Sequence, residues 1–306
     1  MFKLMIFSIV SLALSSCAHR PVAKNQLPAI DNRLQAEVFK SVKVPEPVLL
    51  RLKAKLGETE KTKFNSASKS EVFEGGSLTN TLEESIEFFS NAEIVKLNKD
   101  DEFIERVTTS KKDGQIDLHD FAMPELGEEL LITFNSHGKI LKAGDHSKES
   151  LYFVPPISLP RDPVSIGDTW NMNARWITEQ GVPLSLRLLS ILKGFVDCGQ
   201  AQAHDKTPTK KEVCADIELS GDVNIDSNLA GVQFQSVWRG RVLFALERGA
   251  MVWSLVESHE AWHTEKVHRE VRSCLESLLV EPVGLNVWKD DQHKCLIPTE
   301  ERASQD

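Results

Sequence analysis

The chain has 306 residues, of which 41% are hydrophobic and 26% are charged, and its formal net charge at pH 7 is −9. This composition is that of an ordinary globular protein with enough apolar residues for a large core. The mildly acidic balance argues against nucleic acid as a partner, because phosphate backbones require a basic protein face.

The N-terminus has the pattern of a secretory signal. Lys3 is followed by an apolar run from Leu4 to Leu14, and small residues come next. The run is too short to cross a bilayer, because a spanning helix needs about 20 residues. We therefore expect residues 1–16 to be a signal peptide.

The end of this signal predicts a lipid anchor. The string LSSC, which ends at Cys17, resembles the lipobox of bacterial lipoproteins, in which a peptidase cuts before the cysteine and the thiol receives lipid. A cysteine that merely belongs to the signal is the alternative, but it predicts no particular flanking residues. Ala18 follows in place of aspartate, which predicts sorting to the outer membrane of a diderm bacterium, with the domain facing the periplasm. Several acyl chains on Cys17 would hold the protein firmly, whereas one chain is marginal.

The remaining 290 residues (306 − 16) divide by composition. Residues 17–46 are polar with three prolines and are expected to form a lipidated tether. From residue 47 on, short apolar or alternating runs are separated by turn residues, which is typical of strands and hairpins. We expect residues 47–162 and 163–282 to be two halves of a β domain, followed by a C-terminal tail, 283–306.

The clearest strand runs from Val232 to Leu246. Apolar and polar residues alternate along it, which predicts a half-buried antiparallel strand with one face toward water. The apolar face contains Val232, Phe234, Trp238, Val242, Phe244 and Leu246, and the polar face contains Gln233, Gln235, Arg239 and Arg241. The predicted fold class is therefore mainly β, an open antiparallel half-barrel or curved sheet with few short helices.

An internal repeat divides this β domain. Gly57 and Gly167 each begin a Gly-acid-Thr string that leads into a strand, and Gly138 and Gly249 each lie between two strands. The spacing is 81 residues in the first half (138 − 57) and 82 in the second (249 − 167). The repeat predicts two related halves, and chance similarity of such short strings is the alternative.

Four cysteines remain besides the lipidated one: Cys198, Cys214, Cys274 and Cys295. An even number in an oxidising compartment predicts two disulfides. Three pairings are possible, and we favour the sequential one, with Cys198–Cys214 across the base of a hairpin and Cys274–Cys295 holding the tail. A zinc site is the alternative, but no C-x2-C spacing supports it.

One motif predicts metal chemistry. His259, Glu260 and His263 match H-E-x-x-H, which on a helix places both imidazoles on one face for Zn²⁺ and the glutamate beside the metal-bound water. Apolar residues around the motif recur at helical spacing, so a helix is an option. However, residues 251–256 follow a glycine turn and have a strand pattern, and His268 lies one residue too early for the third ligand of the longer motif. We favour surface histidines, with no metal and no catalytic residue.

The tryptophans offer a possible binding surface. The chain has six Trp and one Tyr, and Trp170, Trp238 and Trp253 lie in expected strands. Tryptophans of this kind most often belong to a core. On the inside of an open sheet, these three would instead line a groove for an acyl chain or a peptide.

Several of these segments together resemble a known family. The strings LKAKLGETEKTKF, MPELGEELLITFNSHGKILKAGD, PPISLPRDPVSIGDTW and ALERGAMVWSLVES are similar to an uncharacterised family of bacterial lipoproteins with a central P-V-x-[VI]-G-D-[ST]-W. The likeness covers residues 48–280 and is most specific from Pro163 to Trp170. That family resembles the half-barrel carriers LolA and LolB, whose concave apolar face holds acyl chains. The strand-bearing part of this chain is longer than in those carriers.

The leading hypothesis is a non-enzymatic outer-membrane lipoprotein without a cofactor, whose sheet binds a hydrophobic ligand or an envelope protein. A structural component of an envelope complex is the alternative, and a zinc metallopeptidase using His259, Glu260 and His263 is the less favoured one.

Overall fold

The computed structural model describes residues 40–98, 101–178, 181–198, 212–225, 232–281 and Cys295. The expected signal peptide, the lipidated Cys17 and most of the C-terminal tail lie outside these residues. The fold is mainly β, as predicted, and consists of one open antiparallel sheet of 11 strands that does not close into a barrel. Among the described residues, no helix is long and apolar enough to cross a membrane.

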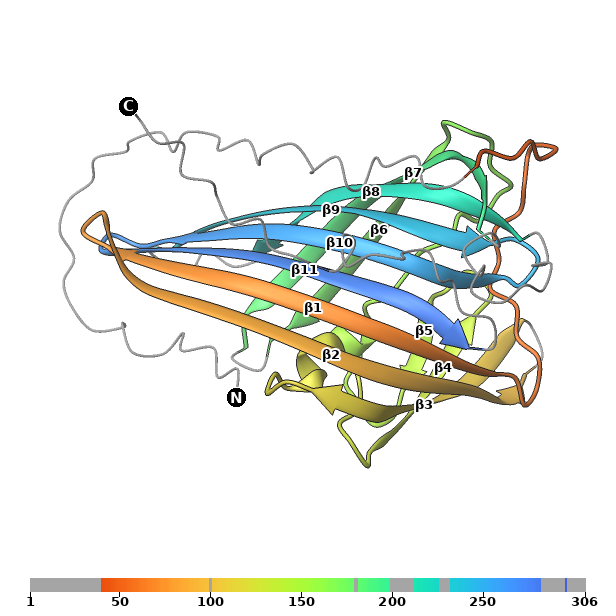
Figure 1. The fold of residues 1–306 in the computed structure, drawn as a ribbon, viewed down its shortest axis with the longest axis horizontal. Helices are drawn as coiled ribbons and strands as arrows, with labels where there is room; N and C mark the ends of the chain where they lie inside the picture. Colours follow the sequence, from red (N-terminus) through yellow and green to blue (C-terminus); the bar gives the residue numbers. More distant parts are fainter. Residues whose placement is uncertain are drawn as a thin grey trace.

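The strands form two meanders that meet in the middle of the sheet (Figure 1). Their order is β5-β4-β3-β2-β1-β11-β10-β9-β8-β7-β6, so β1 pairs with β11, and β5 and β6 are the two edges. The first meander consists of β1 (Thr59–Glu74), β2 (Ser77–Leu97), β3 (Glu102–Asp113), β4 (Glu129–Asn135) and β5 (Ile140–Ala143). The second consists of β6 (Thr169–Ile177), β7 (Pro183–Asp197), β8 (Val213–Ile225), β9 (Gln233–Ala245), β10 (Ala250–His263) and β11 (Val267–Glu281). Two short 3-10 helices are η2 (Leu118–Phe121) and η3 (Leu151–Phe153).

The two faces of the sheet differ in what covers them. Successive side chains of a strand point to opposite faces. We call inner the face that packs against the segments before β1 and between β5 and β6, and outer the opposite face. On β9 the apolar set predicted from the sequence lies on the inner face, where Val242 and Phe244 are both 1% exposed. Gln233, Gln235 and Arg239 alternate with them on the outer face.

The segment before β1 crosses one end of the sheet. We call residues 40–58 the strap and this end the strap end; the strap is the red-to-orange trace at the right of Figure 1. The Val42 N–H donates to Phe195 O on β7 at 2.9 Å, and Val48 pairs with Val164. Further on, the N–H of Leu52 donates to Ser136 O beside β4, so the strap spans both meanders.

The position of the strap corrects one prediction. Residues 40–46 were expected to be part of a tether, but they pack on the sheet: Ser41 bridges to Val196, and Val44 contacts the core. The Glu46 carboxylate accepts a hydrogen bond from the Ile166 N–H at 2.7 Å. Valines at alternate positions give this short segment an apolar side that the sheet can bury, which a polar tether lacks.

The linker between the meanders, residues 144–168, packs on both of them. Tyr152 lies in a core cluster with Phe103 and Leu130 of the first meander, whereas Val154 packs against Met172 and its neighbours in the second. The linker and the strap therefore cover part of the inner face between the two edges of the sheet. Their apolar side chains are what stabilises a sheet that does not close on itself.

The Gly-acid-Thr strings form the same turn in both meanders. In the turns Lys55–Glu58 and Ser165–Asp168, the acid accepts a hydrogen bond from the N–H of the first residue, at 3.2 and 2.8 Å. The third residue is Gly57 or Gly167, with φ of 75° and 92°, where other residues would be strained. One turn leads into β1 and the other into β6, the first strand of each meander.

The second pair of repeat glycines also lies at matching positions. Gly138 is in the turn between β4 and β5, and Gly249 is in the turn between β9 and β10. A Cβ on Gly138 would lie 2.6 Å from Ile157 O, and one on Gly249 would lie 2.7 Å from Arg51 O. Both turns thus need glycine because the linker or the strap lies against them. Common descent of the two halves stays a prediction.

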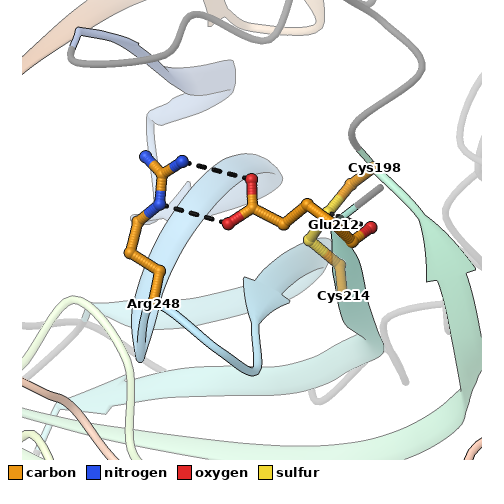
Figure 2. The surroundings of a disulfide bond; sticks show 4 residues. All are labelled: Cys198, Glu212, Cys214 and Arg248. Atoms are coloured by element: carbon orange, nitrogen blue, oxygen red, sulfur yellow. Dashed lines mark hydrogen bonds and ion pairs between the residues drawn. A yellow bond between two sulfur atoms is a disulfide. The ribbon is translucent and has the colours of Figure 1, made fainter. Parts of the chain in front are cut away.

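The disulfide pairing follows the expected sequential pattern. Cys198 after β7 is bonded to Cys214 on β8, and Cys274 on β11 is bonded to Cys295. The first bond closes the base of the β7–β8 hairpin (Figure 2). The second holds a residue of the expected tail against the sheet.

Candidate functional site

An aromatic cluster lies on the inner face at the end of the sheet opposite the strap, which we call the free end. It consists of Trp176 on β6, Phe234 and Trp238 on β9, and Trp262 on β10. The Phe234 and Trp262 rings are 4.2 Å apart, and Trp238 donates to Ser236 Oγ at 2.8 Å. All four side chains are half-buried, so they combine apolar area with access from solvent. Such rings suit the hydrocarbon part of a ligand.

A row of serines follows the cluster along the centre of the inner face. This serine seam consists of Ser66 and Ser70 on β1, Ser254 and Ser258 on β10, and Ser273 and Ser277 on β11. Cross-strand pairs bond through their hydroxyls, Ser254 with Ser277 at 2.7 Å and Ser258 with Ser273 at 2.6 Å. The seam makes the middle of the inner face small and polar between two apolar regions.

Two charged side chains join the seam to the aromatic cluster. Arg269 donates from Nε to Ser70 Oγ at 2.9 Å, and burial lowers its pKa, which Glu260 and Glu84 partly oppose. Burial raises the pKa of Glu260, and the charge of Arg269 partly opposes that shift. The free end of the inner face thus offers a cation, a carboxyl group and hydroxyls beside aromatic rings, the combination that an amphipathic molecule requires.

Two more carboxyl groups lie on the inner face near the strap end. Burial raises the pKa of Glu60 to about 7; Arg248 opposes this shift, and Glu58 and Glu212 add to it. Burial likewise raises the pKa of Glu105 to about 7, with a contribution from the charge of Glu60. Both groups therefore change protonation near neutral pH.

Beside Glu60, Arg248 is held by a two-pronged ion pair. Its Nε and Nη2 donate to the two carboxylate oxygens of Glu212, both at 3.2 Å (Figure 2). The pair lies next to the Cys198–Cys214 disulfide and fixes the guanidinium at the strap end.

The predicted tryptophan groove is only partly right. Trp170 and Trp238 lie on the inner face, but Trp170 is tied to the linker through a hydrogen bond from Nε1 to Ser158 O at 2.7 Å. Trp253 points to the outer face, is 3% exposed, and donates to the Glu276 carboxylate at 2.9 Å. The three tryptophans therefore do not line one surface.

A β-bulge explains the error at Trp253. The pairing of β10 with β9 shifts between Met251 and Trp253, so Met251 packs on the inner core and Trp253 on the outer one. Without the bulge the two residues would share a face. Trp176, Phe234 and Trp262 were not predicted as site residues, although Phe234 was placed on the correct face by the alternation of β9.

The H-E-x-x-H residues lie on a strand and not on a helix. In β10, His259 and His263 point to the outer face and Glu260 to the inner face. A glutamate on the opposite side of the sheet cannot reach water on a metal held by the two histidines, so the zincin geometry is absent here. Among the described residues, no group of three or more His, Cys, Asp or Glu side chains is placed to hold a metal ion.

The two histidines belong to an outer-face network on β10 and β11. His268 Nε2 donates to the Glu270 carboxylate at 2.8 Å, His259 lies 3.5 Å from the same carboxylate, and the His263 ring stacks on the His268 ring with centroids 4.0 Å apart. Burial lowers the pKa of His259, as does Arg272, while Glu270 opposes the shift. Burial and the neighbouring His268 lower the pKa of His263.

Comparison with known proteins gives no family. No protein-family model matches the chain, and neither does any curated protein. A structure of lipovitellin titled for lipid–protein interactions is similar over 74% of this chain, with 10% identity and a TM-score of 0.40, and this chain spans only 25% of it. An outer membrane channel from Pseudomonas putida F1 is similar over 78% of this chain and 100% of the channel, with 10% identity and a TM-score of 0.21. At these scores the similarities establish no shared function.

Proposed function

We propose that this protein is a non-enzymatic lipoprotein of the outer membrane, anchored through Cys17 and facing the periplasm, that binds an amphipathic molecule on the inner face of its sheet. The aromatic cluster is the observation that carries the proposal. Half-buried rings at the free end of a curved sheet provide apolar area that solvent can reach, and this is how sites for hydrocarbon chains are built.

The groups around the cluster favour an acyl chain with a polar head. Arg269 and the serine seam offer donors beside the rings, so a head group with an oxygen acceptor would be bound there while its chain lies on the aromatics. A purely apolar ligand would cover these polar groups without adding a hydrogen bond to them, which is unfavourable.

The ligand test compares two neighbouring residues of β9 on opposite faces. Trp238→Arg places a charge in the aromatic cluster, whereas Val237→Arg changes an outer-face residue that is 36% exposed. Titration with a fluorescent polyene fatty acid should show saturable binding that Trp238→Arg weakens about 10-fold or more, the loss expected from one buried aromatic contact. Val237→Arg should bind as wild type does.

Two results would reject the proposal. One is the absence of saturable binding by the wild-type protein, and the other is an equal loss in both variants while circular dichroism shows that both are folded. Crosslinking followed by isolation of one defined envelope protein, without fatty-acid binding, would favour the alternative of a structural complex component.

The anchor is tested separately. Cys17→Ala should move the protein from the membrane fraction to the soluble periplasmic fraction, because several acyl chains hold a lipoprotein in the bilayer. Unchanged membrane partition of the variant would show that the anchoring is wrong.

A further inference from the structure

We propose that the strap end of the sheet docks on the surface of the bilayer that holds the lipid anchor, an orientation that rests on the proposed anchoring through Cys17. Large apolar side chains are exposed at this end: Leu56 at 67%, Leu49 at 55%, Ile166 at 52% and Leu97 at 48%. Leu56 and Ile166 hold the same place in the two repeated turns, one residue before each glycine.

These side chains are spread along the ends of the strands at the strap end of the sheet. The Gly57 N–H donates to Ile94 O near the end of β2, so Leu56 lies beside the strand end that carries Leu97. Ile166 is held to the strap through the carboxylate of Glu46 at 2.7 Å. We call these four exposed side chains, which are spread along the strap end on the strap and beside it, the apolar rim.

The place where the chain enters the fold puts this rim nearest the membrane. Lys40 pairs with β7 at the strap end, through its carbonyl and the Asp197 N–H at 2.9 Å. Lys40 comes only 23 positions after Cys17 (40 − 17), so the tether spans at most about 80 Å when fully extended. The sheet is itself long: β2 has 21 residues, a length of about 70 Å. If the free end contacted the bilayer, the tether would have to be nearly straight. Contact of the strap end does not require an extended tether.

The charges of the strap and of the β1–β2 hairpin favour the same orientation. The strap carries five basic and two acidic residues, a net charge of +3, in a chain whose net charge is −9. The β1–β2 hairpin at the free end, residues 71–84, carries four acidic residues and no basic one. Leu78 and Leu82 are also exposed in that hairpin, but its charge repels an anionic bilayer surface, which attracts Lys and Arg beside the apolar rim.

Docking of this kind needs little affinity of its own. The anchor makes contact with the bilayer intramolecular, so a small apolar rim with basic neighbours is sufficient. The docked orientation turns the free end, with the aromatic cluster, away from the membrane and toward the periplasm. A ligand could then enter or leave the inner face without passing the lipid surface.

Hydrogen exchange of the full-length acylated protein tests the orientation. The protein is reconstituted in vesicles of phosphatidylethanolamine and phosphatidylglycerol and compared with the soluble Cys17→Ala chain. We expect the turns at residues 55–58 and 165–168 to exchange several-fold more slowly on vesicles, and the β10–β11 hairpin to exchange at the same rate in both. Leu56→Asp combined with Ile166→Asp should remove the slowing, and Leu131→Asp, at an exposed site on the outer face of β4, should not.

The outcomes separate this proposal from the previous one. Vesicle-bound protein whose strap turns exchange as fast as in solution would overturn the docking and leave the anchor intact. A Cys17→Ala chain that stays on membranes would instead overturn the anchoring. If the double variant does not fold, Lys43→Glu with Lys55→Glu reverses two exposed charges of the strap, and slowing that persists unchanged in this variant would also count against the docking.

Discussion

At the scale of single residues, the inner-face carboxyl groups make stability depend on pH in an unusual direction. Glu60 and Glu105 have pKa values of about 7, above the ordinary value of 4.5. Between these values the folded protein binds more protons than the unfolded chain, so the free energy of unfolding falls as the pH rises from 4.5 to 7. The contribution of these two carboxyl groups to the free energy of unfolding is fully present below pH 4.5 and lost above pH 7.

Glu105→Gln should remove part of this dependence, because the amide stays neutral at all pH values. In urea titrations the variant should gain stability relative to wild type as the pH is raised from 5 to 8. Glu83→Gln, at an exposed site of β2, is the control and should follow the wild type. A constant difference between Glu105→Gln and wild type across this range would contradict the prediction.

The outer-face histidines act in the opposite direction. The pKa values of His259 and His263 are lowered in the fold, so the unfolded chain binds more protons once the pH falls below about 6.5. Stability should therefore decrease on acidification through this range. His259→Gln should lessen the loss of thermal stability between pH 7 and 5.5. His146→Gln, at an exposed site, should leave that loss unchanged.

At the scale of elements, the alternation of apolar and polar residues along a strand predicted the face on which each side chain lies. The sequence did not reveal how the strands pair. The sequence of β9 placed Phe234, Trp238 and Val242 on one face, and the structure agrees. The bulge at Met251 depends on how β10 meets β9, so no pattern within β10 could reveal that Trp253 faces outward. The apolar residues at helical spacing around His259 were misleading for the same reason. The strands that pair with this segment on both sides determine its conformation.

The Cys198–Cys214 disulfide should stabilise the β7–β8 hairpin, whose connecting segment it closes over a separation of 16 residues. Replacing both cysteines with serine should lower the free energy of unfolding by about 3 kcal/mol, the value for a loop of this length. Urea denaturation under oxidising conditions measures the change. A double variant as stable as wild type would show that the hairpin is already restrained in the unfolded chain.

At the scale of the whole molecule, the strap holds the two meanders together. Leu50 is fully buried among Phe244, Ile217 and residues of the linker, whereas its neighbour Leu49 is exposed. Leu50→Ala should cost about 3 kcal/mol of unfolding free energy, as for other buried leucines, and Leu49→Ala well under 1 kcal/mol. Equal effects in chemical denaturation would mean that the strap does not stabilise the sheet.

The order of the strands also determines when the sheet can be completed. In the central pair, Glu74 lies opposite Val267 and Thr62 opposite Leu279. The partner of β1 is therefore β11, the last strand in the part of the chain that the structure describes, and it is synthesised after all the others. Until then β1 has free backbone donors and acceptors that any other extended chain could bind. Contacts between residues so far apart also form slowly. Newly made molecules thus pass through an interval in which the middle of the future sheet is an exposed edge, and protection by a chaperone would matter most before β11 is complete.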